Sequence, residues 1–238
     1  MRQALSGALA AILCTAGCAR TRDPLPGFPR IVVWAWERPE DLTSLDPREV
    51  GIAFLARTVR LGRDTLTARP RLVPLRHPAG AALMAVVRVE SRGGGLPSPD
   101  ALAEDIARAA EIPGLRALQV DYDAVASERT FYRDMLGKLR ARLPAEMPLS
   151  MTALVSWCAG DDWLTGLPVA EAVPMLFRMG VPWRGGDFRA GLCRMSVGVA
   201  TDEPFVRVPR GRRVYIFHPR AWSPEALRAA IREARKWL

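Results

Sequence analysis

The stretch from Leu115 to Cys158 constrains the fold of this chain most, because it has the pattern of a strand, a helix and a second strand. Residues 115–122 form a short β-rich run, and residues 127–142 carry apolar side chains four positions apart. Residues 149–155 form a second strand-like run. Consecutive parallel strands need a crossover connection that is right-handed. This unit therefore predicts a parallel sheet.

Six further β-rich runs bring the number of predicted core strands to eight. The eight are 31–36, 50–55, 83–90, 115–122, 149–155, 172–177, 194–199 and 213–217. Ser98 and Ser223 each precede a proline and a helical pattern, as helix caps do. Residues 57–75 read instead as a hairpin, with its turn at 61–64. The order predicts an α/β fold, a compact, irregular (β/α)8 TIM-like barrel with some helices missing; the alternative is an open doubly wound sheet.

The first thirty residues read as a targeting segment followed by a tether. Arg2 precedes a short apolar run at 4–13, and the sequence Thr-Ala-Gly-Cys that ends at Cys18 is similar to a bacterial lipoprotein signal. We therefore expect a signal segment over 1–18, a proline-rich tether over 19–30 and a single barrel domain over 31–238. Lipidation of Cys18 would place the protein on the periplasmic face of a bacterial membrane. An ordinary secretory signal cut nearby is the alternative.

Export determines how the remaining cysteines are interpreted. Cys14 would leave with the signal and Cys18 would carry lipid, so Cys158 and Cys193 would remain as an even pair. Disulfides form in oxidising compartments, and the sequence predicts one between these two residues. Two buried free thiols are the alternative.

The charge of the chain does not indicate a nucleic-acid partner. The formal net charge of +9 comes from arginine, since Lys138 and Lys236 are the only lysines, and no dense basic run or nucleic-acid motif is present. His77 and His218 are the only histidines, and neither has a metal-ligand partner at motif spacing. We therefore expect a monomer without a metal or another cofactor.

Polar residues gather late in the predicted strands. Gln119, Asp121 and Asp123 share one face of strand 115–122, because residues two apart point to the same side. In a parallel barrel, the carboxyl ends of the strands meet at one mouth, where active sites lie. The predicted catalytic residues are Asp121, Asp123 and Glu90, and the predicted substrate-binding residues are Glu37, Arg88, Gln119, Trp36, Trp157 and His218.

Carboxylates beside aromatic rings suit a glycan, whose C–H faces pack on rings while its hydroxyls need polar partners. A buried ion-pair network that plugs a short barrel, with the rings in the core, is the alternative to such a site.

The chain beyond the signal resembles an uncharacterised bacterial family of exported proteins. The resemblance rests on the segments VVWAWERPEDL (32–42), LQVDYDA (118–124), LSMTALVSWC (149–158), VPMLFRMG (173–180) and TDEP (201–204). It implies a TIM-barrel, glycoside-hydrolase-like fold, and it implies no reaction.

Part of the same strand resembles the chitinase-type signature DGxDxDxE. Asp121 and Asp123 match its second and third acids, whereas Val125 occupies the position of the catalytic glutamate and Gln119 that of the glycine. The sequence therefore predicts either a cell-envelope glycoside hydrolase that uses another acid or a lipoprotein that binds a glycan without cleaving it. A basic envelope scaffold, in which the barrel is merely structural, is a third interpretation.

The lipid anchor yields a direct prediction. Replacing Cys18 by Ser removes the thiol that would carry the lipid, so the variant should stay unprocessed or become soluble. Metabolic labelling with a fatty acid and membrane fractionation check this. Unchanged acylation and unchanged membrane association of the Cys18→Ser variant would contradict it.

Overall fold

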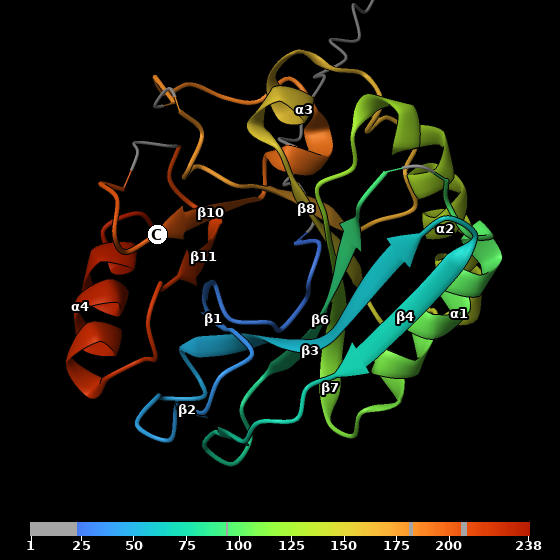
Figure 1. The fold of residues 1–238 in the computed structure, drawn as a ribbon. Coiled ribbons are helices and arrows are strands. Elements are labelled where there is room, and N and C mark those ends of the chain that lie inside the picture. The colour runs from blue at the N-terminus through green and yellow to red at the C-terminus, as the bar shows by residue number, and fades with distance from the viewer. Residues whose placement is uncertain (1–22, 94, 181–182, 206–208) are drawn as a thin grey trace, which may run out of the picture.

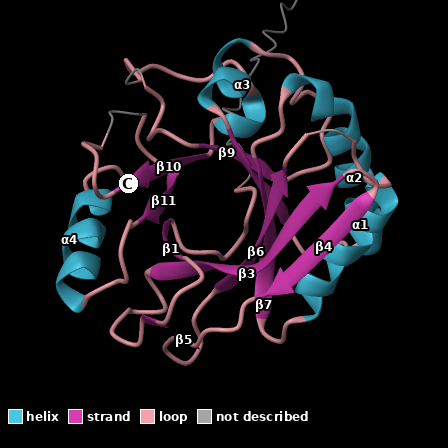
Figure 2. Ribbon diagram, viewed as in Figure 1, coloured by secondary structure: helices cyan, strands magenta, loops and turns pink. Residues whose placement is uncertain are grey.

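The computed structural model describes residues 23–93, 95–180, 183–205 and 209–238, so the predicted signal segment and Cys18 lie outside the described residues. A ring of strands forms the centre of the molecule, and helices cover only parts of its outer surface (Figures 1 and 2). Among the described residues, no helix has the length and apolar character needed to cross a membrane.

In the described ranges, the elements follow one another in a β-rich order with four α-helices. The strands are β1 (Ile31–Ala35), β2 (Glu40–Asp41), β3 (Val50–Gly62), β4 (Thr65–Pro70), β5 (Leu75–Arg76), β6 (Leu83–Ser91), β7 (Leu115–Tyr122), β8 (Leu149–Ala153), β9 (Glu171–Pro174), β10 (Ser196–Ala200) and β11 (Arg213–Phe217). The α-helices are α1 (Pro99–Ala107), α2 (Arg129–Arg142), α3 (Val155–Gly160) and α4 (Pro224–Arg235). Short 3-10 helices are η1 (Arg108–Glu111), η2 (Ala126–Glu128) and η3 (Gly191–Cys193).

Eight parallel strands form a nearly closed barrel. Their order around the ring is β10-β11-β1-β3-β6-β7-β8-β9, and every neighbouring pair along this path is parallel. A single parallel bridge between Met175 and Gly198 joins the two ends of the path. A Cβ atom at position 198 would lie 2.7 Å from the Met175 sulfur, so glycine allows this close approach. The predicted irregular TIM-like barrel is confirmed.

The predicted hairpin is also present, and it extends the barrel wall. Strand β3 runs beyond the ring and pairs in antiparallel fashion with β4. Asp64, in the turn between them, has a φ of 54°, a conformation that Asp tolerates better than most residues. Strand β6 pairs with β3 along this extension, as far as Leu61 opposite Ser91, and Figure 1 shows the hairpin in cyan at the front of the view.

Helices cover the barrel unevenly. The pair α1 and α2 follows β6 and β7, and α4 follows β11. Ser98 and Ser223 cap α1 and α4 through their hydroxyl oxygens, as the sequence predicts. The predicted strand 149–155 ends two residues early, because α3 starts at Val155. In the long connection from β9 to β10, η3 is the only helical element among the described residues.

The inside of the barrel is filled by large side chains. Trp34, Met84, Tyr215 and Phe217 are buried there, and the rings of Trp34 and Phe217 lie 4.1 Å apart. The opposite faces of the strands pack under the helices in a separate apolar cluster. The barrel is therefore a packed core with no open channel.

Residues 23–30 of the expected tether close the amino-terminal end of the barrel. Leu25 and Phe28 are 1% and 5% exposed and belong to the apolar cluster inside the barrel. A Cβ atom on Gly51 would lie 2.5 Å from the Phe28 ring, so glycine makes room for this ring. The tether expectation is thus incorrect for 23–30. The proline content of the segment suggested a tether, although Leu25 and Phe28 are buried in the barrel.

A buried ion pair holds this base together. Arg213 Nη1 lies 3.5 Å from Glu171 Oε2, and both side chains are almost fully buried. Arg213 also donates to the carbonyl oxygens of Leu25, Phe28 and Pro29. Burial raises the pKa of Glu171, while Arg213 and the Tyr215 hydroxyl oppose that shift. The charged groups at the base, Arg213 and Glu171, are therefore paired with each other and with neighbouring polar groups.

The predicted disulfide joins Cys158 on α3 to Cys193 in η3, at a sequence separation of 35. The disulfide fastens the long connection between β9 and β10 to α3 on the outer side of the barrel. Arg212 and Arg194 add ion pairs to Asp187 in the same connection.

Removing this cross-link should lower stability substantially. Closing a loop of this length restricts the unfolded chain, so the variant Cys158→Ala/Cys193→Ala should lose about 3–4 kcal/mol of unfolding free energy. Urea unfolding with and without a reductant measures the effect, and the reductant should leave the double variant unchanged. Equal unfolding midpoints for the oxidised and the fully reduced wild type would contradict the prediction.

Candidate active site at the barrel mouth

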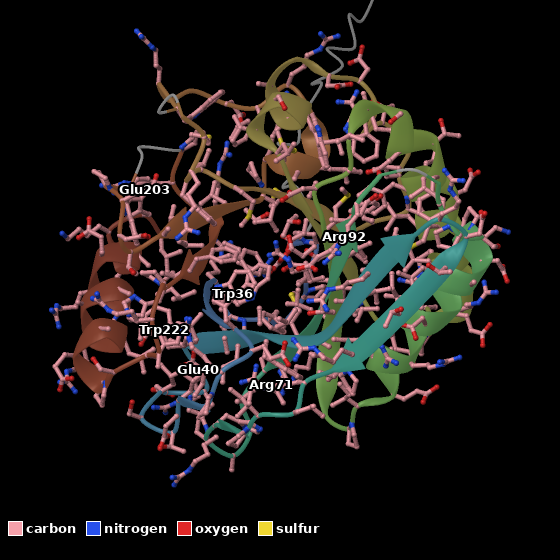
Figure 3. The ribbon with its side chains drawn as sticks, in the orientation of Figure 1. Trp36, Glu40, Arg71, Arg92, Glu203 and Trp222 are labelled. Atoms are coloured by element: carbon pink, nitrogen blue, oxygen red, sulfur yellow. A yellow bond between two sulfur atoms is a disulfide. The ribbon has the colours of Figure 1, made fainter. Side chains whose placement is uncertain are left out.

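The mouth of the barrel contains a cavity of about 440 Å³ at the carboxyl ends of the strands. Its lining comes from β3, β4, β6 and the loops after β1, β9 and β11, and consists of Trp36, Glu37, Arg38, Leu55, Thr58, Arg60, Arg69, Arg88, Glu90, Arg178 and Pro219. Figure 3 shows Trp36 near the centre of the ring of strands. This is the end at which parallel barrels hold their active sites.

Asp121 lies beside this cavity and is the best shielded of the predicted acids. It occupies the penultimate position of β7, and its side chain is 13% exposed. The Thr152 hydroxyl on β8 donates to its Oδ1 at 2.8 Å, and Arg88 Nη1 lies 3.5 Å from its Oδ2. Burial raises the pKa of Asp121 to about 6, although Arg88 and Thr152 act to lower it and Asp123 and Glu90 add to the increase.

Arg88 connects Asp121 to a second carboxylate. Its Nε lies 3.3 Å from Glu90 Oε1, and Arg60 Nε approaches Glu90 Oε2 at 3.1 Å. The Arg88 guanidinium also lies over the Trp36 ring, 5.4 Å from the ring centroid. The order Arg60, Glu90, Arg88, Asp121 therefore forms a chain of alternating charge across β3, β6 and β7.

Glu37 belongs to a separate ion pair at the edge of the same cavity. Arg69 on the hairpin approaches its Oε2 at 2.5 Å. Arg71 fixes the surrounding loops, because its guanidinium donates to the carbonyl oxygens of Trp36 and Arg38. The neighbouring Glu40 is buried and binds Arg38 and the backbone N–H of Trp222.

The structure thus brings five of the predicted residues to the mouth region. These are Trp36, Glu37, Arg88 and Glu90 in the cavity wall and Asp121 beside it. Asp123 follows β7 and is exposed, as its later position on the strand predicts. Arg60, Arg69 and Arg178 were not predicted. A hairpin and a loop carry them, and strand periodicity gives no signal for such positions.

Three predicted residues lie elsewhere, which corrects their assignment. Gln119 is fully buried deeper in the barrel and donates to Ser150 at 2.9 Å. Trp157 is 2% exposed and packs against Trp163 on the outer side of the barrel, with ring centroids 4.8 Å apart. His218 lines a different cavity, of about 620 Å³, against α4. Strand alternation indicated the face of Gln119 but not its depth.

Glu128, the acid that follows position 125 most closely in the sequence, does not replace the catalytic glutamate of the chitinase-type signature. Val125 is 59% exposed. Glu128, three residues later, is buried and accepts hydrogen bonds from the Ser91 hydroxyl and from the backbone N–H of Val125. Glu128 therefore fastens the ends of β6 and β7 together.

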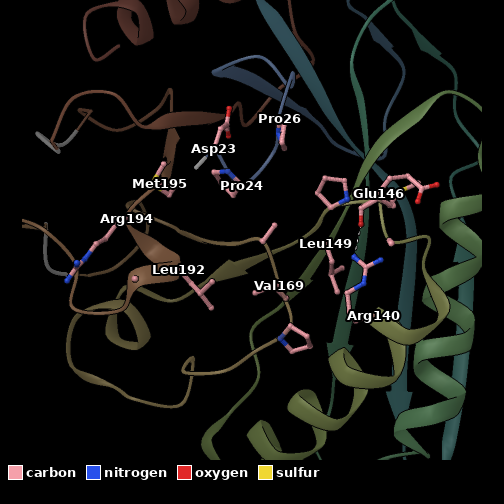
Figure 4. A pocket seen from close by; sticks show the side chains of 16 residues that line it. Asp23, Pro24, Pro26, Arg140, Glu146, Leu149, Val169, Leu192, Arg194 and Met195 are labelled. Carbon is pink, nitrogen blue, oxygen red and sulfur yellow. Dashed lines mark hydrogen bonds between the residues drawn. The ribbon is translucent and has the colours of Figure 1, made fainter. Parts of the chain in front are cut away.

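A cavity larger than that of the mouth lies at the opposite end of the barrel, beneath the base. It has a volume of about 900 Å³, and mainly apolar residues and prolines line it, among them Pro24, Pro26, Leu149 and Val169 (Figure 4). In the part of the chain that the structure describes, no group of three or more His, Cys, Asp or Glu residues could hold a metal ion.

The raised pKa of Asp121 predicts a specific dependence of stability on pH. An ordinary aspartate loses its proton near pH 3.8, whereas folded Asp121 keeps it to about pH 6. The folded state therefore binds this proton more tightly, and the stabilisation is present below pH 3.8 and lost as the pH rises through 6.

The Asp121→Asn variant removes this loss. Relative to the wild type, it should gain up to about 3 kcal/mol of unfolding free energy between pH 3.5 and pH 7.5. Denaturant unfolding of both proteins across this range measures the difference. If the unfolding free energy of the wild type instead rises relative to that of the variant as the pH rises, Arg88 holds Asp121 in a structural ion pair.

Part of the chain matches the model of an uncharacterised protein family. Residues 79–173 match the model of a family described as "Domain of unknown function (DUF3142)", and this span contains Arg88, Glu90 and Asp121. No curated protein matches the sequence.

Among solved structures, the chain is similar to the spore cortex-lytic enzyme SleL of Bacillus cereus, at 18% sequence identity and a TM-score of 0.41. The likeness covers 73% of this chain and 51% of that one, so the chain spans about half the length of this neighbour. At this TM-score the likeness carries no argument about activity. The barrel is established by the strand pairing described above.

Proposed function

We propose that this chain is a lipid-anchored protein of the bacterial cell envelope whose barrel hydrolyses a glycan, with Asp121 as the general acid. The observation that carries the proposal is the Asp121 carboxyl, with a pKa raised to about 6, beside the mouth cavity. A general acid works best when its pKa lies near the pH of the reaction. The protein acts as a monomer, without a cofactor or a nucleic-acid partner.

The surroundings of Asp121 suit proton transfer to a glycosidic oxygen. The protonated carboxyl donates, and the carboxylate that remains is stabilised by the Thr152 hydroxyl and by Arg88. Glycoside cleavage also needs a second carboxylate to stabilise the developing positive charge on the sugar or to activate water. Glu90 and Asp123 are the candidates for this role. Trp36 supplies an aromatic surface in the cavity wall.

A second function, glycan binding without cleavage, is favoured by two observations. Glu37 and Glu90 are both held in ion pairs with arginines, which ties up the carboxylates that line the cavity. In addition, valine occupies position 125, where the chitinase-type signature has its proton donor. Such a protein would retain affinity for the polymer and release no product.

Hydrolysis is tested by incubating the purified protein with peptidoglycan, chitin oligosaccharides and polyuronates and measuring new reducing ends. Asp121→Asn should reduce the rate at least about 100-fold, the usual contribution of a general acid. Activity should fall as the pH rises through about 6. Thr152→Val should move this decline to higher pH, because it removes a hydrogen bond that lowers the pKa of Asp121.

Asp134→Asn provides the matched control, because Asp134 is exposed on α2, away from the residues that line the mouth cavity. Equal rates for Asp121→Asn and the wild type would reject Asp121 as the acid. Binding of one of these polymers without any release of reducing ends would establish the second function instead.

A further inference from the structure

The walls of the mouth cavity contain more arginines than carboxylates. Arg38, Arg60, Arg69, Arg88 and Arg178 line it, against Glu37 and Glu90. Arg38 is committed to Glu40 and to the carbonyl oxygens of His218 and Pro219. The other four face the cavity with the two glutamates, so the lining has an excess of positive charge.

These four arginines keep donors available to a ligand. Their side chains are 36–65% exposed, the lowest value belonging to Arg88 and the highest to Arg178. Arg60 and Arg88 share one carboxylate, that of Glu90. A guanidinium has five N–H donors, so Glu90, together with Asp121 in the case of Arg88, does not occupy them all. Such donors match the two oxygens of a ligand carboxylate.

Arg178 has an unusual backbone conformation. Its φ is 54°, a left-handed conformation that costs free energy in any residue with a Cβ atom. Both carboxylate oxygens of Glu203 accept a hydrogen bond from its backbone N–H, at 2.9 and 3.2 Å. Its guanidinium has one ion pair, with Asp202 at 3.4 Å. Glu203 therefore holds the backbone in a strained form that keeps the exposed arginine at the cavity.

The arginines approach the cavity from opposite sides. Arg60 and Arg69 lie on the β3–β4 hairpin, whereas Arg178 follows β9. Figure 3 shows Glu203 across the opening from the hairpin. A ligand in this cavity would thus meet guanidinium groups on two sides, with Trp36 in the wall between them.

We infer that the mouth cavity recognises a carboxylated glycan, one built from uronic acids or other acidic sugars, and that Arg178 is the residue that binds the sugar carboxylate. This inference rests on the proposed function and names the substrate class for the same site. The apolar ring of Trp36 would pack against the C–H face of a sugar, and the arginines would distinguish an acidic sugar from a neutral one.

Binding of matched polymers to the purified protein tests this inference. The probes are oligogalacturonate, the same oligosaccharide with its carboxyls reduced to alcohols, and dextran sulfate, followed by calorimetry or by tryptophan fluorescence. Oligogalacturonate should bind at least tenfold more tightly than its reduced form, with an affinity that falls as salt is added. Arg178→Gln should abolish this preference, and Arg178→Lys should retain part of it.

Two further variants separate recognition from folding. Arg178→Gly relieves the strained φ, so it should unfold at the same or a higher temperature than the wild type while losing the tenfold preference. Arg232→Gln, in an exposed position on α4, should alter neither property.

Each remaining outcome is decisive. Equal binding of the reduced and the acidic oligosaccharide would overturn the inference and leave the proposed function in place. Tighter binding of dextran sulfate that is insensitive to Arg178→Gln would overturn it in favour of unspecific charge attraction. A loss of thermal stability in Arg178→Gly would show that Arg178 is structural. Binding of no glycan at all, including peptidoglycan and chitin oligosaccharides, would reject the inference and the proposed function together.

Discussion

The buried ion pair between Arg213 and Glu171 is the interaction that closes the amino-terminal end of this barrel. It joins β11 to β9 inside the barrel, and the same guanidinium binds three carbonyl oxygens of the segment that plugs the base. Buried charges are tolerated only when partners surround them, and here they do. Residues 23–30 are thereby held against the amino-terminal end of the barrel, opposite the mouth.

The mouth has the opposite character. Its carboxylates and guanidiniums are partly exposed, and they alternate along β3, β6 and β7. Asp121 is the exception, because burial outweighs its contact with Arg88 and raises its pKa to about 6. A buried carboxyl whose charged form is destabilised lowers the stability of the fold, and its raised pKa suits it to proton transfer. Active sites often contain such groups. The ion pairs around it hold its position.

Much of the fold was predictable from local patterns. All eight barrel strands, the hairpin turn at Asp64 and the serine caps of α1 and α4 follow from periodicity and capping chemistry. The site was predictable only where strand alternation places residues on the inner face, as for Arg88, Glu90 and Asp121. Alternation does not place the other residues, because Gln119 lies too deep in the barrel and Trp157 lies within α3 on the outer side. Arg178 depends on a loop backbone that no periodic pattern encodes.

The most direct measurement is the titration of Asp121 itself. The ¹³C chemical shift of its carboxyl carbon, assigned by comparison with Asp121→Asn, reports the protonation of this one group. A midpoint near pH 6 is the result that our account predicts, because burial there outweighs the charge of Arg88. A midpoint below the ordinary aspartate value of 3.8 would contradict it, since Asp121 would then be a permanently charged partner of Arg88 and no proton donor.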